Sequence, residues 1–283
     1  MPKLENKRIN LQEAKRTSQF YDGKKDIAKL GAGDSYYVVN FLKKERIEIF
    51  DKIMTEVTFA QMFNIGENNA DPIPRLVSAQ SDHQDSGASA IYRMPGCNEK
   101  NIATTEWTPT VRYVCDQASK AIGQQLNHCV LTLFRNEDDS LAFHKDKLID
   151  LQENSLILSV SFGETRPILF HSMDGKDRQT IMLRPGSLLA IGPKTNKTYM
   201  HGIPKLIDHM GPRVSLSLRT IETFIKFEES KDSNNDPIKF QILGKGAEFQ
   251  CANYPFTKSH DDTDAYNDNV KTQIHKHLGI ANK

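Results

Sequence analysis

The stretch from residue 128 to residue 222 constrains the fold most, because almost every segment in it reads as a short β-strand. Turn-forming residues separate these segments at close intervals, in RNEDD, GETRP, MDGKD, RPGS and GPKTNK. Gly, Pro, Asn and Asp favour turns because they tolerate or pre-set the backbone angles that a tight turn needs. Many short strands at this spacing predict a double-sheet β roll.

Two helices are expected before this stretch. Between Lys44 and Thr58 apolar residues recur at every third or fourth position, which predicts an amphipathic helix packed on the core. The apolar positions are Ile47, Phe50, Ile53, Met54 and Val57. Thr108 and Pro109 suit the N-cap and the first turn of a second helix. Its inward residues are expected to be Val111, Val114, Cys115, Ala118, Ile122 and Leu126.

A histidine and an aspartate two positions apart, His144 and Asp146, are the strongest site signal. Residues i and i+2 of a strand point to the same face, so the two side chains should project together. A further histidine, His201, follows in the strand-like segment YMHGIP. Two imidazoles and one carboxylate can hold one face of a ferrous ion and leave its other positions open, as in non-haem iron oxygenases. The sequence therefore predicts an iron site.

The segment RVSLSLR alternates between polar and apolar residues, which predicts a strand with two different faces. Arg213, Ser215, Ser217 and Arg219 would share the polar face. A buried guanidinium without an acidic partner is costly, so this face is expected to meet an anion. Two arginines suit a diacid co-substrate, because each guanidinium can grip a carboxylate through two parallel hydrogen bonds.

These motifs together resemble the catalytic core of the AlkB family of Fe(II)- and 2-oxoglutarate-dependent dioxygenases. The matching segments are FHKD, SLILSVSFG, RPILFH, RPGSLLAIG, YMHGIP and PRVSLSLR, with weaker similarity in IPRLVSAQ, AIYRMPGCN and TTEWTP. The resemblance covers roughly residues 74–224. It implies an α+β, mainly β fold: a double-stranded β-helix (jelly-roll) core with two flanking N-terminal helices and a C-terminal extension. It also implies an oxidoreductase that uses Fe(II), 2-oxoglutarate and dioxygen.

The resemblance assigns roles to individual residues. His144, Asp146 and His201 would ligate iron. Arg213 would pair with the far carboxylate of 2-oxoglutarate, and Arg219 would lie near the carboxylate beside the keto group. Ser215 and Ser217 stand where the family has Asn and Thr, so small polar character is kept. No general base is assigned, because the metal and the co-substrate carry the bond breaking.

Some positions depart from the family pattern. The family has Asn-x-Tyr on the strand before the iron motif, and Thr132 and Phe134 stand at those positions here. Phe lacks the phenol donor, so co-substrate binding is expected to be weaker or to be helped by another group, with Thr132 as a remaining polar contact. Leu148 stands where demethylases of the family often carry an acidic residue. Met94 stands at the place of the lid aromatic, with Tyr92 close by.

Two substrate classes remain open at this point. The first is an N-alkylated nucleobase in DNA or RNA, which must be flipped out of its stack to reach the pocket. The candidate contacts are Tyr92, Arg93, Met94, Trp107 and Leu148. The second is a small metabolite or a protein side chain hydroxylated by the same iron core. Near-neutral charge, the missing lid aromatic and the apolar Leu148 favour the second class, and the family resemblance favours the first.

Composition sets the wider expectations. The 283 residues carry a net charge of +1, so the whole chain gives no argument for polyanion binding. The four cysteines lack CxxC spacing and read as reduced thiols of a cytoplasmic or nuclear protein. No apolar run is long enough to span a membrane and the first residues do not read as a secretory signal, so no membrane contact is expected.

Three regions are expected along the chain. Residues 1–31 form a polar, slightly basic arm with eight Lys/Arg against four Asp/Glu, which could touch phosphates. Residues 32–224 form the dioxygenase domain. Residues 225–283 form a C-terminal extension of unknown role, in which IKFQILG could be a strand, AEFQCANYPF another extended piece and residues 269–280 a helix.

Overall fold

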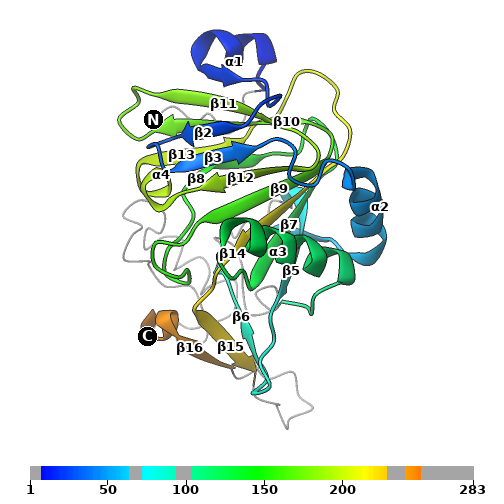
Figure 1. Ribbon diagram of the computed structural model, residues 1–283, viewed down its shortest axis with the longest axis vertical. Coiled ribbons are helices and arrows are strands. Elements are labelled where there is room, and N and C mark those ends of the chain that lie inside the picture. Colours follow the sequence, from blue (N-terminus) through cyan, green and yellow to red (C-terminus); the bar gives the residue numbers. More distant parts are fainter. Residues whose placement is uncertain (1–7, 64–71, 94–103, 228–239, 250–283) are drawn as a thin grey trace.

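Two antiparallel sheets packed face to face dominate the fold (Figure 1). The computed structural model describes residues 8–63, 72–93, 104–227 and 240–249. The mainly β, jelly-roll fold expected from the sequence is confirmed. Among the described helices, none is both long and apolar enough to cross a bilayer.

The larger sheet has, within the described ranges, eight strands in the order β2, β3, β12, β9, β14, β7, β5 and β4. Their pairing is antiparallel throughout. The bounds are β2 (Ile27–Leu30), β3 (Ser35–Val38), β12 (Ser187–Ile191), β9 (Ile157–Gly163), β14 (Arg213–Arg219), β7 (His128–Phe134), β5 (Pro72–Ser81) and β4 (Ala60–Phe63).

The smaller sheet has five strands in the described part of the chain, in the order β1, β11, β10, β13 and β8. Only the pairing of β1 with β11 is parallel. The bounds are β1 (Gln19–Tyr21), β11 (Arg178–Leu183), β10 (Arg166–Ser172), β13 (Tyr199–Ile203) and β8 (Leu141–His144). Residues 19–30, which were expected to lie in the N-terminal arm, thus add a strand to each of the two sheets.

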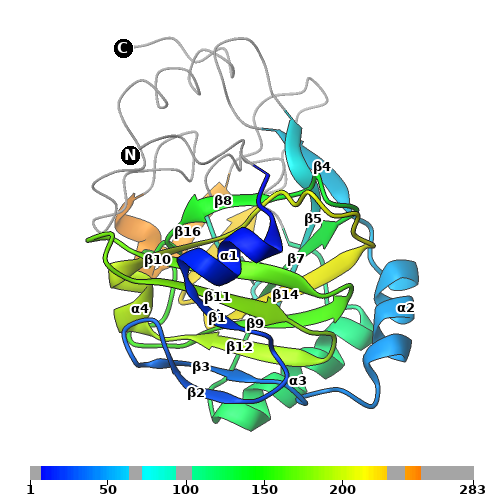
Figure 2. The same ribbon diagram turned by 90° about the horizontal axis from the view of Figure 1, so that it is seen from above.

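One core lies between the sheets and another lies under two helices. Strand alternation separates them: on β14, Val214, Leu216 and Leu218 pack outward against α2 (Arg46–Glu56) and α3 (Pro109–Ile122), and the other face points between the sheets. Figure 2 shows α2 and α3 on the outer side of the larger sheet and the short α1 (Leu11–Thr17) beside the smaller sheet. Pro109 opens α3 as predicted, with Thr108 as its N-cap residue.

The buried face of α2 agrees only in part with the prediction. Of the predicted positions, Ile53 and Val57 are buried and Phe50 packs on the same core. Ile47 and Met54 are 67% and 39% exposed, and Ile49, which was not predicted to face the core, is buried. Ile49 and Ile53 are four residues apart and so share one stripe of the helix, while Ile47 lies on another side. The helix and three of its five inward positions were correctly predicted, but the apolar spacing placed Ile47 and Met54 on the core face and left out Ile49.

Two segments that were predicted to be a turn and an extended chain contain helical structure instead. α4 (Pro193–Thr198) covers most of the GPKTNK segment. A 3-10 helix, η2 (Lys245–Phe249), overlaps the start of AEFQCANYPF, which was expected to be extended. The IKFQILG segment contains β16 (Phe240–Gly244), which joins β15 (Thr223–Phe227) and β6 (Ala88–Ala90) in a third, three-stranded sheet. The helix expected at residues 269–280 lies outside the described residues.

Candidate metal and co-substrate site

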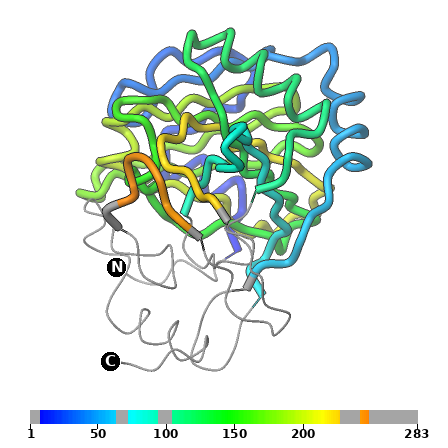
Figure 3. Tube along the Cα trace, turned by 90° about the horizontal axis from the view of Figure 1, so that it is seen from below, coloured from blue at the N-terminus to red at the C-terminus, as the bar shows by residue number. Residues whose placement is uncertain are grey.

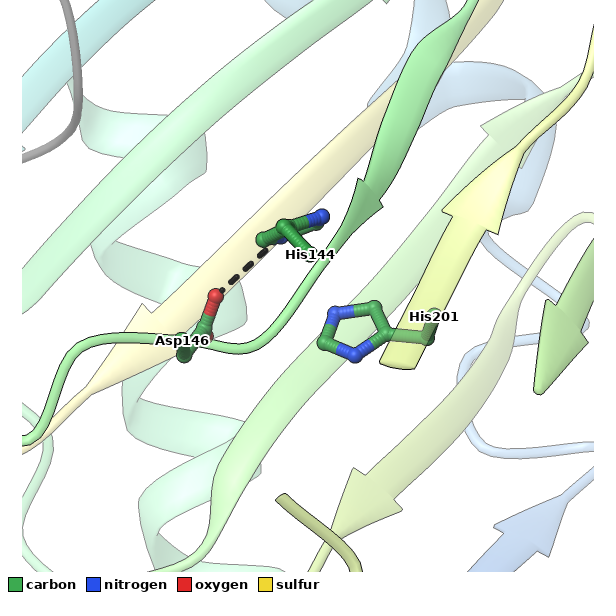
Figure 4. A group of neighbouring side chains, drawn as sticks. All are labelled: His144, Asp146 and His201. Carbon is green, nitrogen blue, oxygen red and sulfur yellow. Dashed lines mark ion pairs between the residues drawn. The ribbon is translucent and has the colours of Figure 1, made fainter. Parts of the chain in front are cut away.

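His144, Asp146 and His201 meet where β8 and β13 lie side by side (Figure 4). Their possible ligand atoms all lie within 4.8 Å of one another, and no other group of three or more His, Cys, Asp or Glu does so among the described residues. His144 and His201 are register partners on the two strands. Strand β8 ends at His144, so Asp146 lies in the following loop and not on the strand that was predicted to carry both.

Two side chains hold Asp146 in place. Arg219 donates from Nε and Nη2 to Asp146 Oδ2 at 3.2 and 2.7 Å. Asn196 on α4 accepts a hydrogen bond from the Asp146 amide and donates one to its carbonyl, both at 2.9 Å. Burial would raise the pKa of the Asp146 carboxyl, but Arg219 and His144 outweigh burial and hold the pKa well below its ordinary value. The carboxylate is therefore ionised and fixed, as a metal ligand requires.

The two imidazoles are suited to metal binding as neutral rings. His144 Nδ1 donates to the carbonyl of Ala142 at 2.9 Å, so the neutral ring leaves Nε2 without a proton. That Nε2 atom lies 3.3 Å from Asp146 Oδ1. Burial, aided by the neighbouring His144, lowers the pKa of His201 to about 3. Two neutral nitrogens and one carboxylate form the donor set that suits ferrous iron.

A cavity of about 650 Å³ opens beside these three residues, between the two sheets. The polar face of β14 lines it as predicted, through Arg213, Ser215, Ser217 and Arg219. Thr132 and Phe134, on the neighbouring strand β7, line the same wall beside Ser215 and Arg213. Among the described residues, the lining holds one acidic side chain and five basic ones: Asp146 against Arg75, Lys145, Lys205, Arg213 and Arg219. The cavity therefore favours an anionic ligand.

Arg213 is buried in the cavity wall, and much of its hydrogen-bonding capacity is unused. Its Nη2 donates to Ser161 Oγ at 2.9 Å and to Ser215 Oγ at 3.3 Å. Its Nε and Nη1 are buried and have no hydrogen-bond partner in the described structure. Burial, with Arg166 adding repulsion, lowers the pKa of Arg213 to about 9. A buried cation with free donors is costly, so a carboxylate that enters the cavity would gain a strong, charge-assisted partner.

Phe134, which stands where the family has Tyr, lies between two guanidinium groups. The guanidinium carbons of Arg213 and Arg166 lie 5.3 and 5.1 Å from its ring centroid. Arg166 is anchored from the other side, donating to the carbonyls of Asn136 and Asp139 at 2.7 and 2.8 Å. The aromatic ring thus supports Arg213 by a cation–π contact, although it offers no hydroxyl donor.

The residues expected to contact the substrate lie in different places. Tyr92 lines the cavity, stacks on Arg219 with the guanidinium 4.1 Å from its ring centroid, and accepts a hydrogen bond from the Lys147 amide at 2.9 Å. Arg93 is buried in an ion pair with Asp150, and Leu148 packs on the core between the sheets. Trp107 packs on the outer core under the helices and donates to Asp82 Oδ1 at 2.7 Å. None of these three residues lines the cavity as the described residues define it. Met94 lies outside the described residues.

Several residues of the site were not found by sequence reasoning. Asn196 lies in a segment that read as a turn, and its contact with Asp146 crosses fifty residues. Ser161 belongs to the SVSFG motif, but only the pairing of β9 with β14 places it beside Arg213. Ile9 from the N-terminal region also lines the cavity, and nothing in its local sequence indicates this.

Comparison with known proteins agrees with this geometry. The profile of the 2OG-Fe(II) oxygenase superfamily matches residues 34–220. The mouse (Mus musculus) protein named DNA oxidative demethylase ALKBH2 is 28% identical over 198 residues, which cover 65% of this chain and 79% of that protein. The bovine (Bos taurus) alpha-ketoglutarate-dependent dioxygenase alkB homolog 3 is 27% identical over 187 residues, covering 63% and 62% of the two chains.

A solved structure titled "The structure of OsALKBH1" aligns with a TM-score of 0.46 and 14% identity, covering 66% of this chain and 98% of that one. The profile match spans more than half of the sequence and includes all three candidate ligands and both arginines of β14. The chain belongs to the 2OG-Fe(II) oxygenase superfamily, as an AlkB-like oxidoreductase that uses Fe(II) and 2-oxoglutarate.

Proposed function

We propose that this protein oxidatively demethylates N-alkylated nucleobases in DNA or RNA, consuming 2-oxoglutarate and dioxygen. One observation carries the oxygenase part of the proposal: Arg213 presents unpartnered, buried donors in the same cavity as His144, Asp146 and His201. This arrangement fits a metal with an anionic co-substrate beside it. A metal site without a co-substrate would leave the buried charge of Arg213 unexplained.

Each residue then has a defined task. His144, Asp146 and His201 would hold Fe(II), and Arg213, with Ser215 and Thr132 nearby, would hold the co-substrate. Arg219 would fix Asp146 and contribute positive charge on the same side of the cavity. When bound, Fe(II) and 2-oxoglutarate supply the oxidation of a C–H bond by dioxygen, coupled to decarboxylation of the co-substrate to succinate. An N-methyl group hydroxylated in this way leaves the base as formaldehyde.

The nucleobase substrate is supported by charge and by the relatives. Three of the cationic residues that line the cavity, Arg75, Lys145 and Lys205, are only partly buried, so they can meet solvent-side phosphates. Tyr92 contributes an aromatic ring to the cavity, a group that suits stacking on an extruded base. Relatives named as DNA oxidative demethylases favour this substrate over a small metabolite or a protein side chain. Such a substrate is met in the nucleus or the cytoplasm.

The test is product formation by the iron-loaded protein under air. Succinate and formaldehyde should rise together when an oligonucleotide with N-methylated bases is added, and not when the unmethylated oligonucleotide is added. The His144→Ala variant, which lacks one candidate ligand, should give neither product. Succinate formation that ignores methylated nucleic acid would reject the nucleobase substrate, and undiminished activity of His144→Ala would reject the metal assignment.

A further inference from the structure

The segment at residues 240–249 lies beyond the part of the chain that matches the superfamily, yet it contacts the loop that carries Asp146. Figure 3 shows this segment in orange next to the yellow strand β15. Ile242 is buried against Ile91 and Ile225 in a small core of its own. The segment is therefore packed on the domain and can fix the position of the residues that it contacts.

The first contact is made by Lys245. Its Nζ donates to the carbonyl of Leu151 at 2.7 Å and to that of Leu148 at 3.2 Å. Both carbonyls belong to residues 145–151, the loop that follows His144 and contains Asp146; we call it the ligand loop. The backbone polar groups of the ligand loop lack the partners that a sheet would provide. Lys245 supplies a hydrogen bond to two of them.

The second contact is made by Gly246. Its carbonyl accepts from Arg93 Nη2 at 3.3 Å, and its amide donates to Thr223 Oγ1 at 3.0 Å. Arg93 in turn grips Asp150 of the ligand loop: its amide donates to Oδ2 at 2.8 Å and its Nε to Oδ1 at 2.9 Å, and Nη2 also contacts Oδ1. The Arg93 and Asp150 side chains are 2% and 0% exposed, so breaking this pair would leave buried charge without compensation.

A side chain at position 246 would strike this ion pair. A Cβ there would overlap Arg93 Nη2 and lie 2.9 Å from Asp150 Oδ1 and 2.7 Å from Thr223 Oγ1. The end of an arginine can usually swing away, but this one is fixed by Asp150. Even one added methyl group would therefore push the guanidinium off the carboxylate.

From Arg93 the contacts continue to the candidate metal ligand. The adjacent Tyr92 accepts from the amide of Lys147 in the ligand loop and stacks on Arg219, which holds Asp146 Oδ2. We propose that Lys245 and Gly246 are positioning residues for the metal site, which hold the ligand loop so that Asp146 faces His144 and His201. The inference rests on the proposed metal assignment and gives the C-terminal region a role in it.

The experiment is a calorimetric titration of Mn(II) into the full-length metal-free protein, with thermal unfolding of the same samples. Lys245→Met keeps the aliphatic stem and removes the donor; because Lys245 is exposed, this variant should fold. Its Mn(II) dissociation constant should rise about threefold or more, with a metal-free melting temperature close to that of the wild type. Lys245→Arg, which keeps a donor, should recover part of the affinity. The matched control is Lys226→Met, an exposed lysine on β15, which should change neither quantity.

Gly246→Ala should weaken Mn(II) binding by about tenfold or more. Its control is Gly211→Ala, where the added Cβ meets nothing nearer than a Glu164 carboxylate oxygen at 3.5 Å. Wild-type Mn(II) affinity in folded Lys245→Met and Gly246→Ala would overturn the positioning role and leave the proposed function standing. A wild-type protein that binds Mn(II) but demethylates nothing would overturn the substrate proposal alone, and one that binds no Mn(II) would overturn both.

Discussion

Arg219 donates two hydrogen bonds to Oδ2 of Asp146, which leaves Oδ1 of the same carboxylate 3.3 Å from His144 Nε2. Oδ2 is thus held by Arg219, and Oδ1 is left facing the histidine. The resemblance to the AlkB family implies that Arg219 lies near a co-substrate carboxylate. In the structure it lines the cavity and already holds Asp146, so we propose that its first task is to orient this candidate metal ligand.

Replacing Arg219 should therefore damage both stability and metal binding. Arg219→Met leaves Asp146 buried without its partner, which should cost about 3–5 kcal/mol of the free energy of unfolding. Metal affinity should fall about 10- to 100-fold, as is usual when a group that orients a ligand is lost. Urea denaturation and Mn(II) titration measure the two effects. Arg8→Met, which removes an exposed ion pair with Asp138 and a hydrogen bond to the Leu206 carbonyl, serves as the control and should cost only about 1–2 kcal/mol. Equal losses in the two variants would contradict this role of Arg219.

Replacing Arg213 should have the opposite effect on stability when no co-substrate is bound. Its Nε and Nη1 are buried without partners, so Arg213→Met should leave the ligand-free protein as stable as the wild type or make it more stable. The dissociation constant of 2-oxoglutarate should rise at least about tenfold, because one charge-assisted hydrogen bond is worth about 1.5–3 kcal/mol. Calorimetric titration of the metal-loaded protein measures the affinity.

The matched variant is Arg166→Met. Arg166 is equally buried, but its Nη groups donate to three carbonyls, so its loss should destabilise the ligand-free protein. If Arg213→Met destabilises the protein as much as Arg166→Met does, the buried charge of Arg213 is already satisfied and does not await a ligand.

The sequence was informative wherever strand periodicity decides direction. The alternation along Arg213–Arg219 correctly predicted which side chains of β14 face the cavity, because a period of two leaves only two possible faces. The spacing of apolar residues on α2 was less decisive, because a helix can offer more than one apolar stripe, and Ile47 and Met54 proved exposed. The sequence did not predict the register that pairs His144 with His201, since strand register is a property of the whole sheet.

Contacts between distant, irregular segments could not be predicted from the sequence. The amide of Asn196 and the backbone of Asp146 meet because α4 docks beside the ligand loop, and α4 itself is fixed by Asp34, which accepts from the amides of Lys194 and Thr195. No periodic signal marks such contacts, since each depends on loop geometry and on a single side chain. The same holds for Lys245 and the two carbonyls of the ligand loop.

Restoring a hydroxyl at position 134 should strengthen co-substrate binding. Phe134 lines the cavity beside Arg213, so the added oxygen of Phe134→Tyr should reach a bound dicarboxylate. The dissociation constant of 2-oxoglutarate should fall at least about tenfold, since a hydrogen bond to a charged group is worth about 1.5–3 kcal/mol. The ligand-free variant should lose stability, because a new buried hydroxyl lacks a partner until the ligand binds.

The control variant is Phe162→Tyr, which places the hydroxyl in the outer core under the helices. It should lose stability and gain no affinity for 2-oxoglutarate. Unchanged affinity in Phe134→Tyr would mean that the ring does not face the co-substrate.

Acid sensitivity should come in part from His128, at the start of β7. Burial, with the positive charge of Arg219, lowers the pKa of His128 to about 3, and its Nδ1 has no hydrogen-bond partner in the described structure. In the unfolded chain the pKa is about 6.5. Between these values the unfolded state binds a proton that the folded state does not. The free energy of unfolding should therefore fall, as the pH drops from 6.5 toward 3, by up to about 1.4 kcal/mol per pH unit for this residue.

His128→Leu removes that proton uptake and should weaken the dependence of the free energy of unfolding on pH. Urea denaturation of the metal-free protein at pH 7, 6 and 5 measures it. His201 has a similarly lowered pKa in the absence of metal, so the variant should retain roughly half of the slope that the two histidines cause in the wild type. A His128→Leu variant with the full wild-type slope would show that His128 takes up its proton in the folded state, and that its burial does not limit the stability of the protein in acid.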